Sequence, residues 1–213
     1  MGMGKAMRLC MIAFLTGLVR PVYALDVQSP DGQVVISLNV QDLPGVQGCP
    51  VYRVRYGGRP IVADSCLGFE LDTGVLQSGL SMTVLSQGRH DTQWTPVYGE
   101  RSQVRDHYRQ AHIQLQEKVA PHRVVQLSLR AYNEGVAFCY TLPKQSALDR
   151  VTIQEELTEF CFTGDHAAWA TYSAQGRYTK TSLTKIKPGC ERPLTLQWAD
   201  QGYAAVGEAR LVD

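Results

Sequence analysis

The feature that most constrains the fold is a two-residue alternation of apolar and polar side chains, which recurs along the chain after residue 24. One such run places four aliphatic residues on a common face: Val34, Ile36, Leu38 and Val40. The segment 52–56 alternates in the same way, with arginines at its polar positions. Because successive side chains of a strand point to opposite faces, this spacing predicts half-buried β-strands.

The strongest pairing signal lies between residues 125 and 140. An alternating run, 125–131, is followed by the turn residues Asn133-Glu134-Gly135 and by an apolar segment, 136–140. This order predicts an antiparallel hairpin. Three more strands are predicted at Thr152–Phe162, Leu194–Trp198 and Tyr203–Glu208. The first four residues of the last one are apolar on both faces, as in a central strand. The polar segment 173–187 is predicted to be a long surface loop.

Helical patterns are weak throughout. No stretch longer than about ten residues keeps a 3.6-residue period with capping residues. The 19 glycines and 10 prolines punctuate the chain at intervals that suit short strands. We therefore predict an all-β, mostly antiparallel sandwich in one domain. The 213 residues leave no room for a (β/α)₈ barrel of ~200–250 residues beside it.

The first 24 residues have the pattern of a secretory signal peptide. Basic residues precede the apolar run 9–19, and Val22 and Ala24 flank a cleavage point after Ala24. The run has about half of the ~20 residues that span a bilayer, which argues against an anchor. We expect a signal peptide at 1–24, a mature domain at 25–213 that leaves the membrane after cleavage, and a periplasmic or secreted location.

Charge and cysteine spacing argue against two functional classes. The chain has 21 basic and 20 acidic residues, and its formal net charge is +1. No basic face is implied, so no nucleic-acid partner is expected. The cysteines after the leader include no Cys-x-x-Cys pair, which argues against a zinc site. One or two disulfides can form in an oxidising compartment, in pairings that the spacing alone leaves open.

No catalytic motif is present. The chain has no nucleophile elbow, phosphate-binding loop or dinucleotide fingerprint. His107 and His112 are five residues apart, which puts them on opposite faces of a strand and argues against a shared metal ion. Glu155 and Glu159 on one strand would be about 13 Å apart, too far for the paired carboxylates of a glycosidase. A solvated strand face explains them better, and no catalytic residue is assigned.

The segment 94–100, WTPVYGE, is the best candidate for ligand contact. Trp94 can stack on the C–H face of a sugar, and Glu100 can bind sugar hydroxyls. His107, in the RDHY segment that follows, adds a polar group. These three residues are the predicted carbohydrate-binding residues. The alternative is a loop that folds on its own apolar core.

Taken in order, the segments of the chain resemble the N-terminal domain of glycoside hydrolase family 97. The matching stretches are SPDGQVVISLNV (29–40), YGGRPIV (56–62), LGFEL (67–71), WTPVYGE with RDHY (94–108), LRAYNEGVAFCYTLP (129–143), ELTEF (156–160) and YAAVGEARLVD (203–213). They span essentially the whole mature chain. Their order, more than any single motif, carries the resemblance.

The resemblance implies a β-super-sandwich of the galactose mutarotase-like type. Enzymes of the family are periplasmic or secreted α-glycosidases whose catalytic residues lie in a separate (β/α)₈ barrel. Their N-terminal domain packs on the barrel and lends one glutamate to an active-site calcium, and Glu208 matches that glutamate by its place in the terminal segment. Because calcium takes about 6–8 oxygen ligands, this chain alone is expected to hold only part of such a site.

Two features depart from the family pattern. The sequence stops at Asp213, where the barrel would follow, and Cys139 and Cys161 stand where polar residues are expected. A Cys139–Cys161 disulfide is accordingly a further prediction. We expect a carbohydrate-associated scaffold domain, a fragment of a calcium-dependent α-glycosidase without catalysis of its own. The alternatives are a freestanding carbohydrate-binding module and a periplasmic partner of a separately encoded barrel.

Overall fold

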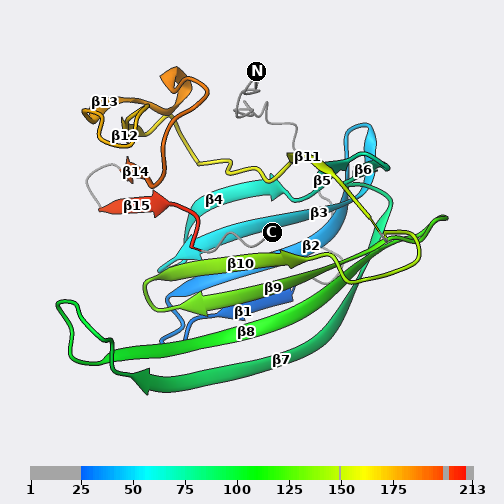
Figure 1. Ribbon diagram of the computed structural model, residues 1–213, viewed down its shortest axis with the longest axis horizontal. Coiled ribbons are helices and arrows are strands. Elements are labelled where there is room, and N and C mark those ends of the chain that lie inside the picture. The colour runs from blue at the N-terminus through cyan, green and yellow to red at the C-terminus, as the bar shows by residue number, and fades with distance from the viewer. Residues whose placement is uncertain (1–24, 149, 199–201, 210–213) are drawn as a thin grey trace. The chain divides into compact units, whose positions relative to one another are not determined.

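The computed structural model describes residues 25–148, 150–198 and 202–209. They form two compact units, one ending at Phe160 and one beginning at Cys161. The described residues contain four antiparallel sheets and one short 3₁₀ helix, and no α-helix (Figure 1). The predicted all-β, antiparallel class is confirmed. No helix of the described residues is long and apolar enough to cross a membrane, and the predicted signal peptide lies outside them.

The first sheet of the larger unit has the strand order β1-β2-β3-β4. Its strands are β1 (Leu25–Gln28), β2 (Val34–Leu43), β3 (Val46–Tyr56) and β4 (Arg59–Cys66). Ile36 and Leu38 of β2 are fully buried and Val34 is 3% exposed, so the predicted alternation does define a core face. Tyr52 of β3 lies opposite Leu38 and continues this face.

The second sheet has the order β10-β9-β8-β7. Its strands are β7 (Leu80–Trp94), β8 (Val104–Glu117), β9 (Val124–Tyr132) and β10 (Gly135–Thr141). The predicted hairpin is confirmed, because Gly135 pairs with Tyr132 and the register continues to Thr141 and Gln126. The long β7–β8 pair was not predicted from the sequence.

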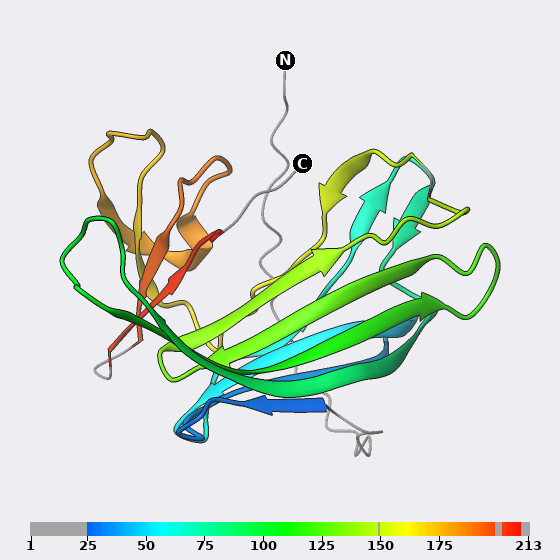
Figure 2. The same ribbon diagram turned by 60° about the horizontal axis from the view of Figure 1, so that its bottom comes forward.

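The two sheets pack face to face (Figure 2). Strand β2 contacts β7, β9 and β10 across the interface. The side chains between the sheets include Ile36, Leu38, Ile113, Leu127 and Leu129, all fully buried. Burial of each such side chain stabilises a fold by about 1.5–3 kcal/mol relative to exposure. This shared core holds β8, which carries the predicted site residue His107, in a fixed register beside β7, which carries Trp94.

A small third sheet, β11-β5-β6, completes the larger unit. It consists of β5 (Phe69–Leu71), β6 (Gly74–Leu76) and β11 (Ile153–Glu156). Strand β11 is shorter than the predicted strand Thr152–Phe162. Glu159 therefore lies beyond the strand, where its carboxylate accepts a hydrogen bond from the Cys66 amide at 2.9 Å. The interpretation of Glu155 and Glu159 as one solvated strand face is corrected.

The smaller unit contains a four-stranded sheet with the order β13-β12-β14-β15. Its elements are β12 (Ala167–Ala170), β13 (Thr179–Ser182), the 3₁₀ helix η1 (Leu183–Lys185), β14 (Leu194–Gln197) and β15 (Tyr203–Val206). Ala168, Leu183, Leu194 and Leu196 form its core.

Two predictions for this unit are wrong. The expected surface loop 173–187 contains β13 and η1, because Leu183 is drawn into the core. Strand β15 pairs with the predicted β14 but is not a central strand. It lies at an edge of the sheet and Tyr203 is 69% exposed, because β12 occupies the other side of β14.

Candidate functional site

The candidate site lies on the β7–β8 ribbon, at the end where these two strands are joined by residues 95–103. The register is continuous from Ser86, opposite His112, to Trp94, opposite Val104. Side chains therefore alternate regularly between the two faces of this ribbon. Trp94 lies on one face with His90 and Asp106, whereas His107 lies on the other face with Asp91.

The face that bears Trp94 is rich in aromatic and ionisable groups, and we call it the aromatic face (His90, Trp94, Asp106, Tyr108, Arg130 and Tyr132). The His90 ring stacks on Tyr108 with a centroid distance of 4.9 Å, and its Nε2 lies 3.5 Å from Asp106. The Arg130 guanidinium lies 4.4 Å above the Tyr108 ring, and the Tyr132 ring is 5.0 Å away.

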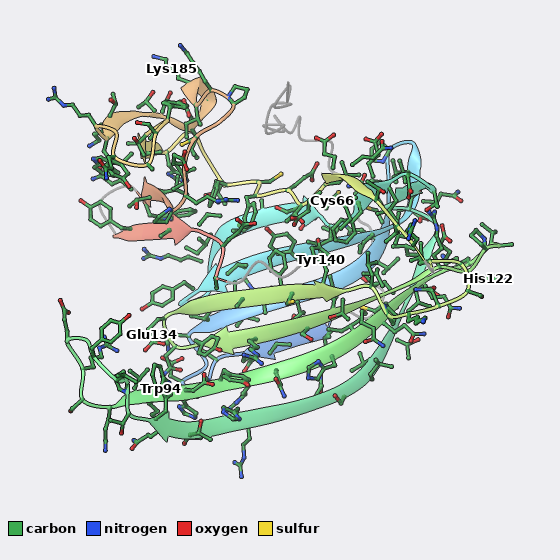
Figure 3. The ribbon with its side chains drawn as sticks, viewed as in Figure 1. Cys66, Trp94, His122, Glu134, Tyr140 and Lys185 are labelled. Atoms are coloured by element: carbon green, nitrogen blue, oxygen red, sulfur yellow. The ribbon has the colours of Figure 1, made fainter. Side chains whose placement is uncertain are left out.

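The aromatic rings on this face differ in how far they are buried. Tyr108 is only 4% exposed beneath its neighbours, and this burial raises the pKa of its hydroxyl. Trp94 is 54% exposed at the end of β7, and Figure 3 places it at the same end of the unit as Glu134. Tyr108 is therefore a structural support, whereas Trp94 is exposed enough for a ligand to reach its ring.

The opposite face of the ribbon carries an ion cluster. Arg105 donates two hydrogen bonds of 2.7 Å to the carboxylate of Asp91, and His107 Nε2 lies 3.8 Å from the same group. The hydrogen bonds from Arg105 lower the pKa of Asp91 most, and the nearby histidines lower it further. His107 is thus engaged with Asp91 and turned away from Trp94, so these two predicted residues do not share a surface.

The loop between the strands exposes apolar side chains. Val97 and Tyr98 are 99% and 90% exposed, and Glu100 is also exposed. The alternative of a loop folded on its own apolar core is therefore not borne out. Glu100 follows the exposed Trp94 by six residues in the sequence, and the exposed side chains of Val97 and Tyr98 lie between them in the chain.

Glu208 follows β15 in the smaller unit. Its carboxylate forms an ion pair with Arg192, and the two side chains are 40% and 62% exposed, respectively. Within the described residues, no group of three or more His, Cys, Asp or Glu side chains is arranged to hold a metal ion. Glu208 can therefore supply one carboxylate to a shared site but cannot build a site with its described neighbours.

The cysteines of the predicted disulfide differ in their surroundings. Cys139 is exposed on β10, and its Sγ lies 3.4 Å from the carbonyl oxygen of Tyr140. Cys161 is buried at the start of the smaller unit. The described cysteines form no disulfide in this structure, and the Cys139–Cys161 bond stays a prediction.

A second polar surface was not identified from the sequence. On the outer face of the first sheet, a depression of about 200 Å³ is lined by Asp26, Ser37, Asn39, Gln41, Val51, Arg53 and Arg55. Arg53 pairs with Asp64 at 2.9 Å and Arg55 lies 3.7 Å from Asp26. In the sequence, only the alternating arginines Arg53 and Arg55 of β3 could have indicated this surface. Both arginines form ion pairs with neighbouring aspartates, as is typical of a solvated sheet face.

Comparison with known proteins relates the chain to a protein family. Residues 27–213 match the family model described as Glycosyl-hydrolase 97 N-terminal. Two solved structures of a glycoside hydrolase family 97 enzyme from Pseudoalteromonas sp. strain K8, one with panose and one with acarbose, are each 26% identical to the chain. Each has a TM-score of 0.74 and covers 81% of this chain.

A crystal structure of a β-arabinopyranosidase has the same fold, with 22% identity, a TM-score of 0.77 and 88% coverage of this chain. The matches cover only 26% of the Pseudoalteromonas enzyme and 32% of the β-arabinopyranosidase. The chain thus spans about a quarter to a third of the length of these relatives. It matches their N-terminal part and not the catalytic part.

Proposed function

Because the chain belongs to the glycosyl-hydrolase 97 N-terminal family, we propose that it is the carbohydrate-associated scaffold domain of an α-glycosidase, with no catalysis of its own. In this role its sandwich packs on a (β/α)₈ barrel that carries the catalytic groups. The proposal includes a galactose mutarotase-like super-sandwich, a cleaved signal peptide and a periplasmic or secreted location. The single observation that carries it is the match to the N-terminal part alone of larger glycoside hydrolases.

The exposed loop 95–103 supports a packing role. Val97, Tyr98 and Trp94 are all more than half exposed, and a cluster of exposed apolar side chains is typical of a surface that meets another molecule. In the scaffold role, this loop contacts the barrel or a carbohydrate bound between the two domains. Truncation of its apolar side chains then weakens the association and leaves the buried sandwich core intact.

Glu208 fits a calcium ion only as one ligand among several. Calcium takes about 6–8 oxygen ligands, and a single carboxylate supplies one or two. The described residues around Glu208 offer a cation, Arg192, in place of further oxygen ligands. In the proposed role, Glu208 exchanges Arg192 for a calcium ion that the barrel holds with its own ligands. The ion when bound would act as a Lewis acid.

The absence of autonomous catalysis is tested first. The purified full chain is assayed with p-nitrophenyl α-glucoside and α-galactoside, with and without added calcium. We expect rates equal to the buffer blank. Hydrolysis that rises in proportion to protein concentration and survives repeated purification would overturn the scaffold proposal.

A freestanding carbohydrate-binding module is the second candidate, favoured by the exposed Trp94 on the aromatic face. Calorimetric titration of the full chain with panose and acarbose separates the two. The scaffold proposal expects no saturable heat, whereas a binding module gives a saturable isotherm. That isotherm should disappear in Trp94→Ala and persist in the matched loop variant Val97→Ala.

A partnership with a separately encoded barrel is distinguished by the DNA that follows the codon for Asp213. A barrel continuing in the same reading frame favours the domain of a single enzyme. An intact barrel gene next to this one favours a split enzyme, and co-purification of the two products then tests the association directly.

A further inference from the structure

Two cysteines of the larger unit meet on neighbouring strands. Cys49 lies on β3 and Cys66 ends β4, and the register pairs Val51 of β3 with Cys66. Because Cys49 is two residues from Val51, its side chain lies on the same face of the sheet, diagonally across from Cys66. The strands are held together here by the hydrogen bond from the Leu67 amide to the Pro50 carbonyl, 3.0 Å.

Each of the two cysteines is the largest influence on the pKa of the other. A hydrogen bond between them lowers the pKa of Cys49 and is the largest cause that raises the pKa of Cys66. Burial and the nearby Glu159 raise the pKa of Cys66 further. The raised pKa keeps the Cys66 thiol protonated, and the Cys49 thiol donates to the Pro50 carbonyl oxygen at 3.8 Å.

Glu159 holds Cys66 in position through two hydrogen bonds to the Cys66 backbone. Its carboxylate accepts the Cys66 amide at 2.9 Å, and its own amide donates to the Cys66 carbonyl at 2.9 Å. Cys66 is labelled in Figure 3 near the end of β4. This two-point clamp keeps the Cys66 backbone beside β3, so the thiol stays on the side of Cys49.

We propose that Cys49 and Cys66 are an oxidation site, at which a low-molecular-weight disulfide such as oxidised glutathione converts the two thiols into one intramolecular disulfide. The reaction consumes two protein thiols and one small-molecule disulfide, and it releases two small-molecule thiols that carry away both protons. This pairing differs from the Cys139–Cys161 pairing predicted from the sequence, and it does not depend on the proposed scaffold function.

The exposure of the two sulfurs sets the order of the steps. Cys49 is 1% exposed, whereas Cys66 is partly exposed. Cys66 therefore attacks the small disulfide first, forming a mixed disulfide and releasing the first small thiol. Cys49 then attacks the Cys66 sulfur and releases the second. Because a thiol that holds its proton reacts slowly, oxidation of the folded chain takes longer than oxidation during folding.

Peptide mapping of the full chain tests the pair. The folded, reduced protein is equilibrated with oxidised and reduced glutathione, alkylated, and digested with trypsin without reduction. Cleavage after Arg53 and Arg55 separates Cys49 from Cys66, so a linked peptide reports the bond directly. We expect this linked peptide, and its loss on reduction. Separate alkylated peptides for Cys49 and Cys66, or a linked peptide that pairs either one with another cysteine, would overturn the proposal.

Single variants test the order of attack. In Cys49→Ser, Cys66 should accumulate as a mixed disulfide with glutathione. In Cys66→Ser, the buried Cys49 should remain unmodified, and the matched control Cys139→Ser should form the linked peptide as the parent chain does. Glutathione on Cys49 of a folded Cys66→Ser variant would contradict the order. Should a variant fail to fold, the peptide map of the unaltered chain still decides the pairing.

Discussion

Glu208 and Arg192 are brought together by the register of two neighbouring strands. Leu194 of β14 pairs with Val206 of β15, so the same register carried two residues outward sets Arg192 beside Glu208. Their side chains form an ion pair in which both groups keep part of their contact with water, at 62% exposure for Arg192 and 40% for Glu208. Such exposed pairs gain little energy, because water screens the attraction. This leaves Glu208 available to another cation at low cost.

Glu208→Gln should change the free energy of unfolding of the full chain by less than about 1 kcal/mol, because the pair is exposed. Urea denaturation measures the change, and Arg192→Gln provides the matched control with the same expected size. A double-mutant cycle should give a coupling within the same limit. A loss several times larger would show that the carboxylate is a structural element of the smaller unit.

Arg123 makes an ion pair and several hydrogen bonds within the larger unit. It pairs with Glu117 at 2.6 Å and donates hydrogen bonds to the carbonyls of Thr73, Gly74 and Val75. Its side chain is only 6% exposed. This single guanidinium therefore connects Glu117 of β8 to Thr73 and to the first two residues of β6.

Arg123→Ala should destabilise the fold by about 3–5 kcal/mol, because it leaves the buried Glu117 carboxylate without its partner. The matched control is Arg105→Ala, which removes an exposed pair with Asp91 and should cost less than about 1 kcal/mol. Chemical denaturation of both variants makes the comparison. Equal losses in the two variants would contradict the assigned role of Arg123.

His166 gives the smaller unit a predicted sensitivity to acid. Its ring stacks on Trp198 with a centroid distance of 4.3 Å, and burial lowers its pKa from the ordinary value of 6.5. Its Nε2 is buried and has no hydrogen-bond partner among the described residues. The folded state thus favours the neutral ring.

For a base with a lowered folded-state pKa, the unfolded state binds the proton more readily. The contribution of His166 to stability is therefore complete above pH 6.5 and declines as the pH falls through the lowered pKa. Thermal unfolding measured from pH 7.5 to pH 5 should show this loss, and His166→Phe should reduce the slope. An unchanged slope would assign the acid sensitivity to other groups.

Gly48 allows β3 to approach the first residue of β7, Leu80, closely. Its φ is +62°, and a Cβ built there would lie 2.9 Å from the backbone nitrogen of Leu80. Gly48→Ala should cost about 1–3 kcal/mol, because it adds this clash to a left-handed backbone. The matched control is Gly45→Ala, which has a φ of +78° and no atom within 4 Å. Denaturation midpoints should rank Gly48→Ala as the less stable variant, and the reverse order would contradict the clash.

The sequence predicted those strands whose two faces differ. Val34–Val40 and the 125–140 hairpin alternate clearly, because one face of each strand is buried between the sheets. Strand β7 escaped prediction because most of its side chains are exposed on both faces, which removes the apolar alternation. The edge position of β15 was missed because it depends on β12, which is distant in the sequence and pairs with the other side of β14.

The candidate site could be predicted only in part. WTPVYGE was identified as the candidate carbohydrate-contact segment; Trp94 is 54% exposed, and its contact with a carbohydrate stays a prediction. The faces of Trp94 and His107 could not be deduced, because they depend on the register across the loop 95–103. One residue more or less in the paired register would have placed both side chains on one surface.

The position of β15 has a consequence for handling the protein. One side of Tyr203–Val206 is bonded to β14, and the other side presents backbone groups that no described strand pairs with. An open strand edge of this kind is a template for a further strand, including one from another copy of the chain. The smaller unit is therefore where self-association should begin at high protein concentration, and a lysine at the exposed Tyr203 is the substitution suited to suppress it.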